Sequence, residues 1–124
     1  MPLNVLLVDP SLQAREALKI SLSKVLGEIV FWEAKDARAA FLELEQKKPG
    51  LIITDLEIPG SEGKTFLRRI RSAQGDGQPP VVALSGRITP ELLAEFHKDP
   101  LVWFVQKPAA PGEIADLAGK LLGG

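Results

Sequence analysis

Four polar side chains, namely two carboxylates, a hydroxyl and an ammonium, each follow a short apolar run of the chain: Asp9, Asp55, Ser85 and Lys107. The intervals between them are 46, 30 and 22 residues, so only tertiary structure can bring them together. In phosphoryl chemistry, one carboxylate can act as the nucleophile and another can hold a divalent cation, while a hydroxyl and an ammonium bind phosphoryl oxygens. The set therefore indicates phosphoryl chemistry, provided that the fold gathers it at one place.

The apolar runs themselves predict strands. They are short, mostly continuous and rich in β-branched or aromatic residues, which is typical of a parallel sheet covered on both faces. The segments between them place apolar residues at helical spacing. The expected strands are Leu3–Val8, Ile29–Trp32, Leu51–Thr54, Val81–Leu84 and Val102–Val105, and the expected helices are 11–26, 36–48, 62–73, 91–98 and 111–122.

This alternation predicts an α/β fold, namely a doubly wound, five-stranded parallel sheet with helices on both faces. We expect one domain over residues 1–124, with 72–80 as a loop and no room for an effector domain. Ligands of an open α/β sheet bind beyond the carboxyl ends of its strands. Taken singly, the four polar residues could be a helix cap, a turn residue, the start of a loop and an exposed lysine. Their joint occurrence at four strand ends favours a site.

Composition excludes several other classes of function. The 124 residues carry 15 Lys plus Arg against 16 Asp plus Glu, so we expect neither nucleic acid nor membrane to be held by charge. The chain has no cysteine, and its one histidine, His97, lacks partners for a zinc site. We find no leader-like segment and no apolar run long enough to cross a bilayer, and therefore expect a cytoplasmic protein.

The chain resembles the receiver domain of two-component response regulators over nearly its entire length. The matching pieces, in order, are LLVD at 6–9, DLEIPGSEG at 55–63, VVALSG at 81–86 and FVQKP at 104–108. No single piece is specific to this family, but the order and the spacing of the four pieces together are. The resemblance implies the flavodoxin-like strand order 2-1-3-4-5, for which the receiver fold is itself a standard example.

The resemblance also implies a role for each residue that matches the motif. Asp55 would accept a phosphoryl group, Lys107 would pair first with that carboxylate and then with the phosphoryl group, and Ser85 would bind a phosphoryl oxygen. Asp9, Asp55 and the backbone carbonyl of Glu57 would hold Mg²⁺.

Residues around these positions match the family as well. Phe104 occupies the position of the aromatic residue that acts as a switch in the family, and it would act together with Ser85. Pro108 occupies the position where the family has a cis-proline, and Pro59 and Gly63 match the family's loop after the phosphoacceptor.

One departure from the family's pattern concerns the residues that would bind Mg²⁺. Receivers usually place two adjacent acids after the first strand, whereas this chain has Asp9 followed by Pro10. Proline offers no side-chain oxygen, so we expect weakened Mg²⁺ binding, with Asp9 and Asp55 as the minimal pair of carboxylates. The Glu57 side chain could replace the missing acid or could be a solvated loop residue.

Two hypotheses follow for function. The favoured one is a phosphorylatable single-domain receiver in a phosphorelay, with a histidine kinase or phosphotransfer protein upstream. Its output would be protein–protein contact through the face formed by 91–98, 102–105 and 111–122, from a monomer or weak homodimer. The alternative is a degenerate receiver that binds its partner without phosphorylation. A dehalogenase-type phosphatase is a third reading, but such enzymes need a second Asp where Glu57 stands. We expect no conventional enzyme, but at most self-phosphorylation from a phosphodonor and self-dephosphorylation.

Two further groups of residues have simple structural explanations. The basic residues of segment 62–73, namely Lys64, Arg68, Arg69 and Arg71, are interpreted as a solvated helical face. Trp103 and Phe104 are neighbours on a strand and should point to opposite faces, one of them into the core.

Overall fold

The computed structural model describes residues 3–74 and 78–123 and contains five strands that alternate with five helices. The strands are β1 (Leu3–Val8), β2 (Ile29–Ala34), β3 (Leu51–Asp55), β4 (Val81–Ser85) and β5 (Val102–Gln106). The helices are α1 (Leu12–Leu26), α2 (Ala37–Gln46), α3 (Gly63–Gln74), α4 (Pro90–Phe96) and α5 (Pro111–Leu121). The predicted alternation is confirmed.

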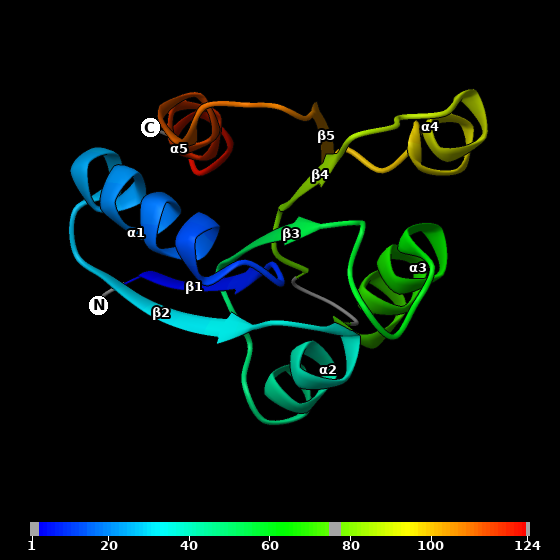
Figure 1. Cartoon of the computed structure of the whole chain (residues 1–124), viewed down its shortest axis with the longest axis horizontal. Helices are drawn as coiled ribbons and strands as arrows, with labels where there is room; N and C mark the ends of the chain where they lie inside the picture. The colour runs from blue at the N-terminus through cyan, green and yellow to red at the C-terminus, as the bar shows by residue number, and fades with distance from the viewer. Residues whose placement is uncertain (1–2, 75–77, 124) are drawn as a thin grey trace.

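All five strands are parallel and form one sheet in the order β2-β1-β3-β4-β5. Figure 1 shows α1 and α5 on one face of this sheet and α2, α3 and α4 on the other. The predicted doubly wound fold and strand order are therefore confirmed. Because every strand runs in the same direction, the carboxyl ends of β1, β3, β4 and β5 lie along one edge of the sheet.

Each face of the sheet has its own apolar core, because successive side chains of a strand point to opposite faces. On the α1/α5 face, Val5 and Leu7 pack with Ile53, Leu84 and Ile114. On the opposite face, the core consists of side chains from β1, β3 and β4 together with α2, α3 and α4, including Leu6, Val8, Ile52, Phe66, Leu67, Ile70, Ala83 and Phe96. The central strand β3 is buried along its whole length.

Helix boundaries follow the capping residues. The Asp36 carboxylate accepts a hydrogen bond from Ala39 N–H at 2.8 Å, and α2 then ends at Gln46, two residues before the predicted end. Thr89 caps α4 in the same way through Leu92 N–H, with Pro90 in the first turn. Helix α3 extends to Gln74, into the segment predicted as a loop, and residues 75–77 of that loop lie outside the described residues.

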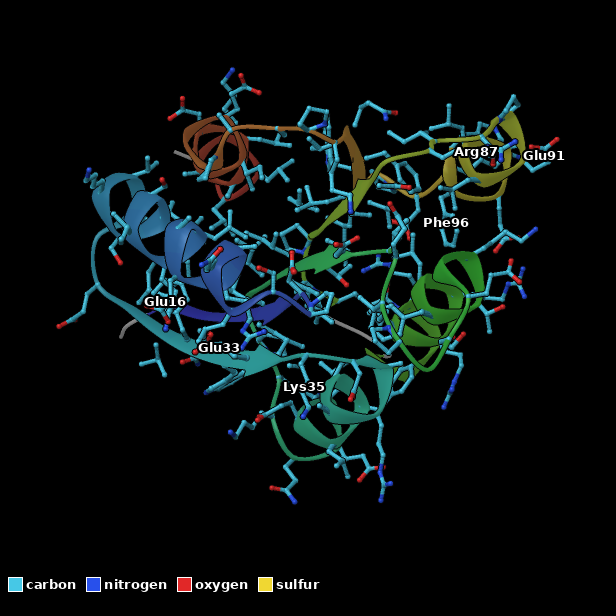
Figure 2. The ribbon with its side chains drawn as sticks, viewed as in Figure 1. Glu16, Glu33, Lys35, Arg87, Glu91 and Phe96 are labelled. Atoms are coloured by element: carbon cyan, nitrogen blue, oxygen red, sulfur yellow. The ribbon has the colours of Figure 1, made fainter. Side chains whose placement is uncertain are left out.

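Strand β2 is two residues longer than predicted, because the polar Glu33 is part of it. Its carboxylate pairs with Arg15 Nε at 3.0 Å and Lys19 Nζ at 3.1 Å, both on α1. Figure 2 shows Glu33 on β2 beside Glu16 of α1. These ion pairs hold the edge strand against the helix, and an apolar run alone does not reveal them.

The interpretation of a fully solvated basic face on α3 is wrong for Arg71, which is buried. Its guanidinium donates to both carboxylate oxygens of Asp99, at 2.8 and 3.0 Å, and to the Pro79 carbonyl at 2.9 Å. Arg71 lies one turn after the buried Leu67, at the margin of the apolar stripe of α3. It therefore ties α3 to the segments that enter β4 and β5.

Among the described residues, no helix has both the length and the apolar character that crossing a membrane requires.

Candidate functional site

The four polar residues predicted to converge do follow neighbouring strands of the sheet. Asp9 comes directly after β1, Asp55 and Ser85 are the last residues of β3 and β4, and Lys107 comes directly after β5. Asp9, Asp55 and Ser85 are buried, although the hydrophobic effect alone would leave such groups in water.

The clearest contact of the site joins Lys107 to Asp55. Lys107 Nζ lies 2.9 Å from Asp55 Oδ1 and 3.0 Å from Oδ2, across 52 residues of sequence. The Asp55 side chain is 9% exposed, so its carboxylate is almost withdrawn from water and the ammonium compensates its charge. The Lys107–Pro108 peptide bond is cis, as the resemblance implied for Pro108.

Hydrogen bonds and charges tune Lys107 further. Burial alone would lower the pKa of its ammonium, but the hydrogen bonds and negative charges of Asp55 and Glu57 outweigh it and raise the pKa above its usual value. The group therefore stays cationic at neutral pH.

Asp9 completes the acidic part of the site. Its Oδ1 accepts a hydrogen bond from Ser11 N–H at 2.8 Å, and its backbone carbonyl accepts one from Arg15 Nη1 at 2.6 Å. Burial raises the pKa of the Asp9 carboxyl, and the nearby Asp55 charge adds to this rise, against the opposing effects of Ser11, Lys107 and Arg15. A divalent cation would relieve this crowding of like charges.

Receiver domains generally bind Mg²⁺, and the donors of this chain fit that ion in part. Asp9 and Asp55 supply two carboxylates, whereas Pro10 is exposed and has no side-chain oxygen to offer. Over residues 3–74 and 78–123, no three acidic or histidine side chains are grouped so as to hold a metal. The role of Asp9, Asp55 and Glu57 in holding Mg²⁺ stays a prediction.

The Glu57 side chain is directed elsewhere. Its Oε1 accepts a hydrogen bond from Gly86 N–H at 2.6 Å and lies 3.2 Å from Lys107 Nζ. Both partners lie on the β4 and β5 side of Asp55, whereas Asp9 follows β1 on the other side. In this conformation the carboxylate is directed toward Gly86 and Lys107, and the idea that it replaces the missing acid stays a prediction. Its contact with Gly86 was not predicted, because it depends on a side-chain conformation that sequence spacing does not determine.

Ser85 and Phe104 lie beside this cluster. The Ser85 hydroxyl donates to the Arg87 carbonyl at 3.0 Å and accepts from Arg87 N–H at 3.1 Å, so it is held by its own loop. Phe104 points into the core, where its ring centroid lies 6.1 Å from that of Phe96, while Trp103 on the opposite face is 45% exposed. The opposite orientations predicted for these two neighbours are confirmed. Figure 2 shows Phe96 between α4 and α3.

The loop after Asp55 is shaped by close backbone packing. A Cβ at Gly63 would lie 2.8 Å from the Leu56 carbonyl oxygen, so only glycine fits there. Asp55 Oδ1 also accepts a hydrogen bond from Glu57 N–H at 2.9 Å, which fixes the first turn of this loop.

The chain is thus an α/β domain with a doubly wound sheet and a buried carboxylate paired with an ammonium at the carboxyl edge of that sheet. Residues 5–118 match the family described as "Response regulator receiver domain". The chain therefore belongs to the response regulator receiver family, as the resemblance of its motifs implied, and the phosphatase reading is set aside.

The chain is similar to parts of longer curated proteins. The chain is 38% identical over 89 residues to a "Gliding motility regulatory protein" of Myxococcus xanthus, an alignment that covers 72% of this chain and 11% of that protein. It is 31% identical over 123 residues to "Protein-glutamate methylesterase/protein-glutamine glutaminase 5" of the same species, covering 98% of this chain and 35% of that protein. The chain thus spans about a third or less of the length of these relatives.

Solved structures show the same fold. The chemotaxis response regulator CheY4 of Vibrio cholerae superimposes with a TM-score of 0.80 at 22% identity, covering 98% of this chain and 99% of that chain. The signal receiver domain of a putative Luxo repressor protein from Vibrio parahaemolyticus gives a TM-score of 0.82 at 23% identity, covering 99% and 92% of the two chains. The chain is therefore a receiver domain by family and by fold, and a gliding motility regulatory protein is among its relatives.

Proposed function

We propose that this receiver is a phosphorylatable relay module in which Asp55 accepts a phosphoryl group from phosphohistidine on a kinase or phosphotransfer protein. The observation that carries the proposal is the pair of 2.9 and 3.0 Å contacts between Lys107 and the Asp55 carboxylate at the carboxyl edge of the sheet. A buried carboxylate held beside a cation is suited to act as a nucleophile.

In the proposed transfer, an Asp55 carboxylate oxygen forms a bond to phosphorus as the bond from phosphorus to the histidine nitrogen breaks. The electron pair of the broken bond stays on the imidazole. Lys107 then pairs with the phosphoryl oxygens, and the Ser85 hydroxyl turns from Arg87 to bind one of them. Mg²⁺, held by Asp9, Asp55 and the Glu57 carbonyl, would neutralise phosphoryl charge when bound.

We propose further that the signal leaves through the face formed by α4, β5 and α5, read by a downstream protein. When Ser85 moves toward the phosphoryl group, space opens for the Phe104 ring on the neighbouring strand, and α4 shifts. This face exposes Leu93 and Trp103, which are both 45% exposed. We place the chain in the cytoplasm, as a monomer or weak homodimer that acts through protein contact and not on nucleic acid.

The test is covalent modification by a small phosphodonor. Incubation with phosphoramidate and Mg²⁺ should add one phosphoryl group, seen as a single mass increment by intact-protein mass spectrometry. Asp55→Asn should abolish it, because the amide is not a nucleophile, and a control change of the exposed Glu28 to Gln should not. An unmodified wild-type chain that also fails to bind beryllofluoride would support the alternative, a receiver that binds its partner without phosphorylation.

A further inference from the structure

The Glu57 carboxylate occupies a position that the proposed chemistry does not account for. Its Oε1 is 2.6 Å from Gly86 N, directly after β4, and 3.2 Å from Lys107 Nζ, directly after β5. The same Nζ contacts both oxygens of Asp55. Glu57 and Asp55 therefore share one ammonium.

These contacts use the donors that a phosphoryl group on Asp55 would need. Oxygens of such a group would lie beyond the Asp55 carboxylate, beside the ends of β4 and β5. The donors there are the Lys107 ammonium, the Ser85 hydroxyl and the Gly86 N–H. The Glu57 carboxylate already binds the first and the last of these.

The Glu57 carboxylate lies close to the backbone of Gly86 and is stabilised by hydrogen bonds. A Cβ on Gly86 would come within 3.2 Å of Glu57 Oε1, closer than ordinary van der Waals contact. Partial burial alone would raise the pKa of the Glu57 carboxyl, but the Gly86 N–H, the Ser85 hydroxyl and Lys107 hold it below its usual value. Glu57 is therefore an anion at neutral pH, in a place that binds anions.

We propose that Glu57 is an internal competitor of the phosphoryl group: its carboxylate fills the phosphoryl-binding position of the unmodified protein and must leave before Asp55 can be phosphorylated. This inference rests on the proposed function. It assigns to Glu57 the control of the rate at which Asp55 is phosphorylated. A phosphoryl donor must displace one anion and approach against its charge, and both effects slow the reaction.

The side chain has room to leave. Its exposed fraction is 50%, and a cavity of about 420 Å³ adjoins it, lined in part by Glu57, Gly63, Gly86 and Thr89. Displacement therefore needs a rotation of one surface side chain and no opening of the core.

Two variants separate the effects of charge and of the carboxylate group. Glu57→Gln removes the charge at nearly constant size, and Glu57→Ala removes the whole group. With phosphoramidate and Mg²⁺, we expect phosphorylation about tenfold faster in Glu57→Ala and a smaller acceleration in Glu57→Gln, because the amide oxygen can still accept from Gly86 N–H. The matched control is Glu62→Gln, which removes an exposed acid from the same loop and should leave the rate within about twofold.

A second measurement tests the contact itself without phosphorylation. In ¹H–¹⁵N spectra, the Gly86 amide proton should move upfield in Glu57→Ala, because it loses a charged acceptor, and should stay in place in Glu62→Gln. Circular dichroism of each variant checks that the fold is retained.

The outcomes separate the two ideas. Equal phosphorylation rates in the wild type and Glu57→Ala overturn the inference and leave the proposed function standing, and an unmoved Gly86 amide also overturns the inference. If no variant is phosphorylated or binds beryllofluoride, the proposed function fails and the inference falls with it. Slower modification of the wild type than of Glu57→Ala would support both ideas.

Discussion

At the scale of single residues, Lys107 is the group on which the acidic site depends. It contacts the carboxylates of Asp55 and Glu57, and removing it leaves the buried Asp55 carboxylate without its ammonium partner. We expect Lys107→Ala to lower the free energy of unfolding by about 1–2 kcal/mol, less than for a fully buried pair because the lysine side chain is 32% exposed. Urea denaturation at neutral pH measures this.

The double variant provides the control for that prediction. Lys107→Ala combined with Asp55→Asn should be more stable than the sum of the two single changes predicts, because the second substitution removes the uncompensated buried charge. Purely additive effects would contradict the view that Lys107 stabilises the fold through Asp55.

The residues of the site differ in how far sequence alone predicts them. Asp55 and Lys107 could be placed together because each follows a strand and parallel strands end at one edge. The Glu57 carboxylate could not be placed, because its position depends on the backbone N–H of Gly86 and on one side-chain rotation. The sequence left open whether the Glu57 side chain replaces a metal ligand or is solvated. The structure adds contacts with the Gly86 N–H and the Lys107 ammonium, while half of the side chain is exposed.

At the scale of elements, Arg71 fixes α3 to the segments before β4 and β5. Arg71→Ala would leave the Asp99 carboxylate and the Pro79 carbonyl without their guanidinium partner. We expect a loss of about 2–3 kcal/mol in the free energy of unfolding, since the arginine side chain is only 10% exposed. Chemical denaturation followed by circular dichroism measures the loss.

Arg68 supplies a matched comparison on the same helix. It makes a bidentate pair with Glu95, but this pair is exposed to solvent. Arg68→Ala should therefore leave the unfolding midpoint nearly unchanged. A similar loss in both variants would contradict the view that the buried contacts of Arg71 determine the effect, because alanine itself favours the helix.

The elements themselves were largely predictable, and the errors have physical causes. A continuous apolar run predicts a strand only as far as the residues stay apolar. The sequence therefore predicts the end of β2 before Glu33, whose charge is compensated by basic residues of α1. Helical periodicity places Arg71 at the edge of the apolar stripe but does not show that Asp99, 28 residues later, comes to meet it. Contacts between charged groups far apart in sequence were missed in both cases.

At the scale of the whole molecule, the proposed function requires a path from Asp55 to the α4–β5–α5 face. The sheet supplies it, because β4, which ends in Ser85, pairs directly with β5, which carries Phe104 and Trp103. Phe104 packs against Phe96 of α4, so a movement of this ring would be felt by the helix. The exposed indole of Trp103 lies on the same strand and can report on that movement.

This path makes a prediction about Phe104→Ala. In a Trp32→Phe background, where Trp103 is the remaining tryptophan, beryllofluoride with Mg²⁺ should change the indole fluorescence of the parent protein. Phe104→Ala should lose at least about half of that change while still binding beryllofluoride by ¹⁹F NMR, because the ring that couples β5 to α4 is gone. Phe41→Ala, which removes the same type of side chain from α2 on the other side of α3, should keep the full response. An unchanged response in Phe104→Ala would mean that the signal reaches this face through the loop after Ser85 instead.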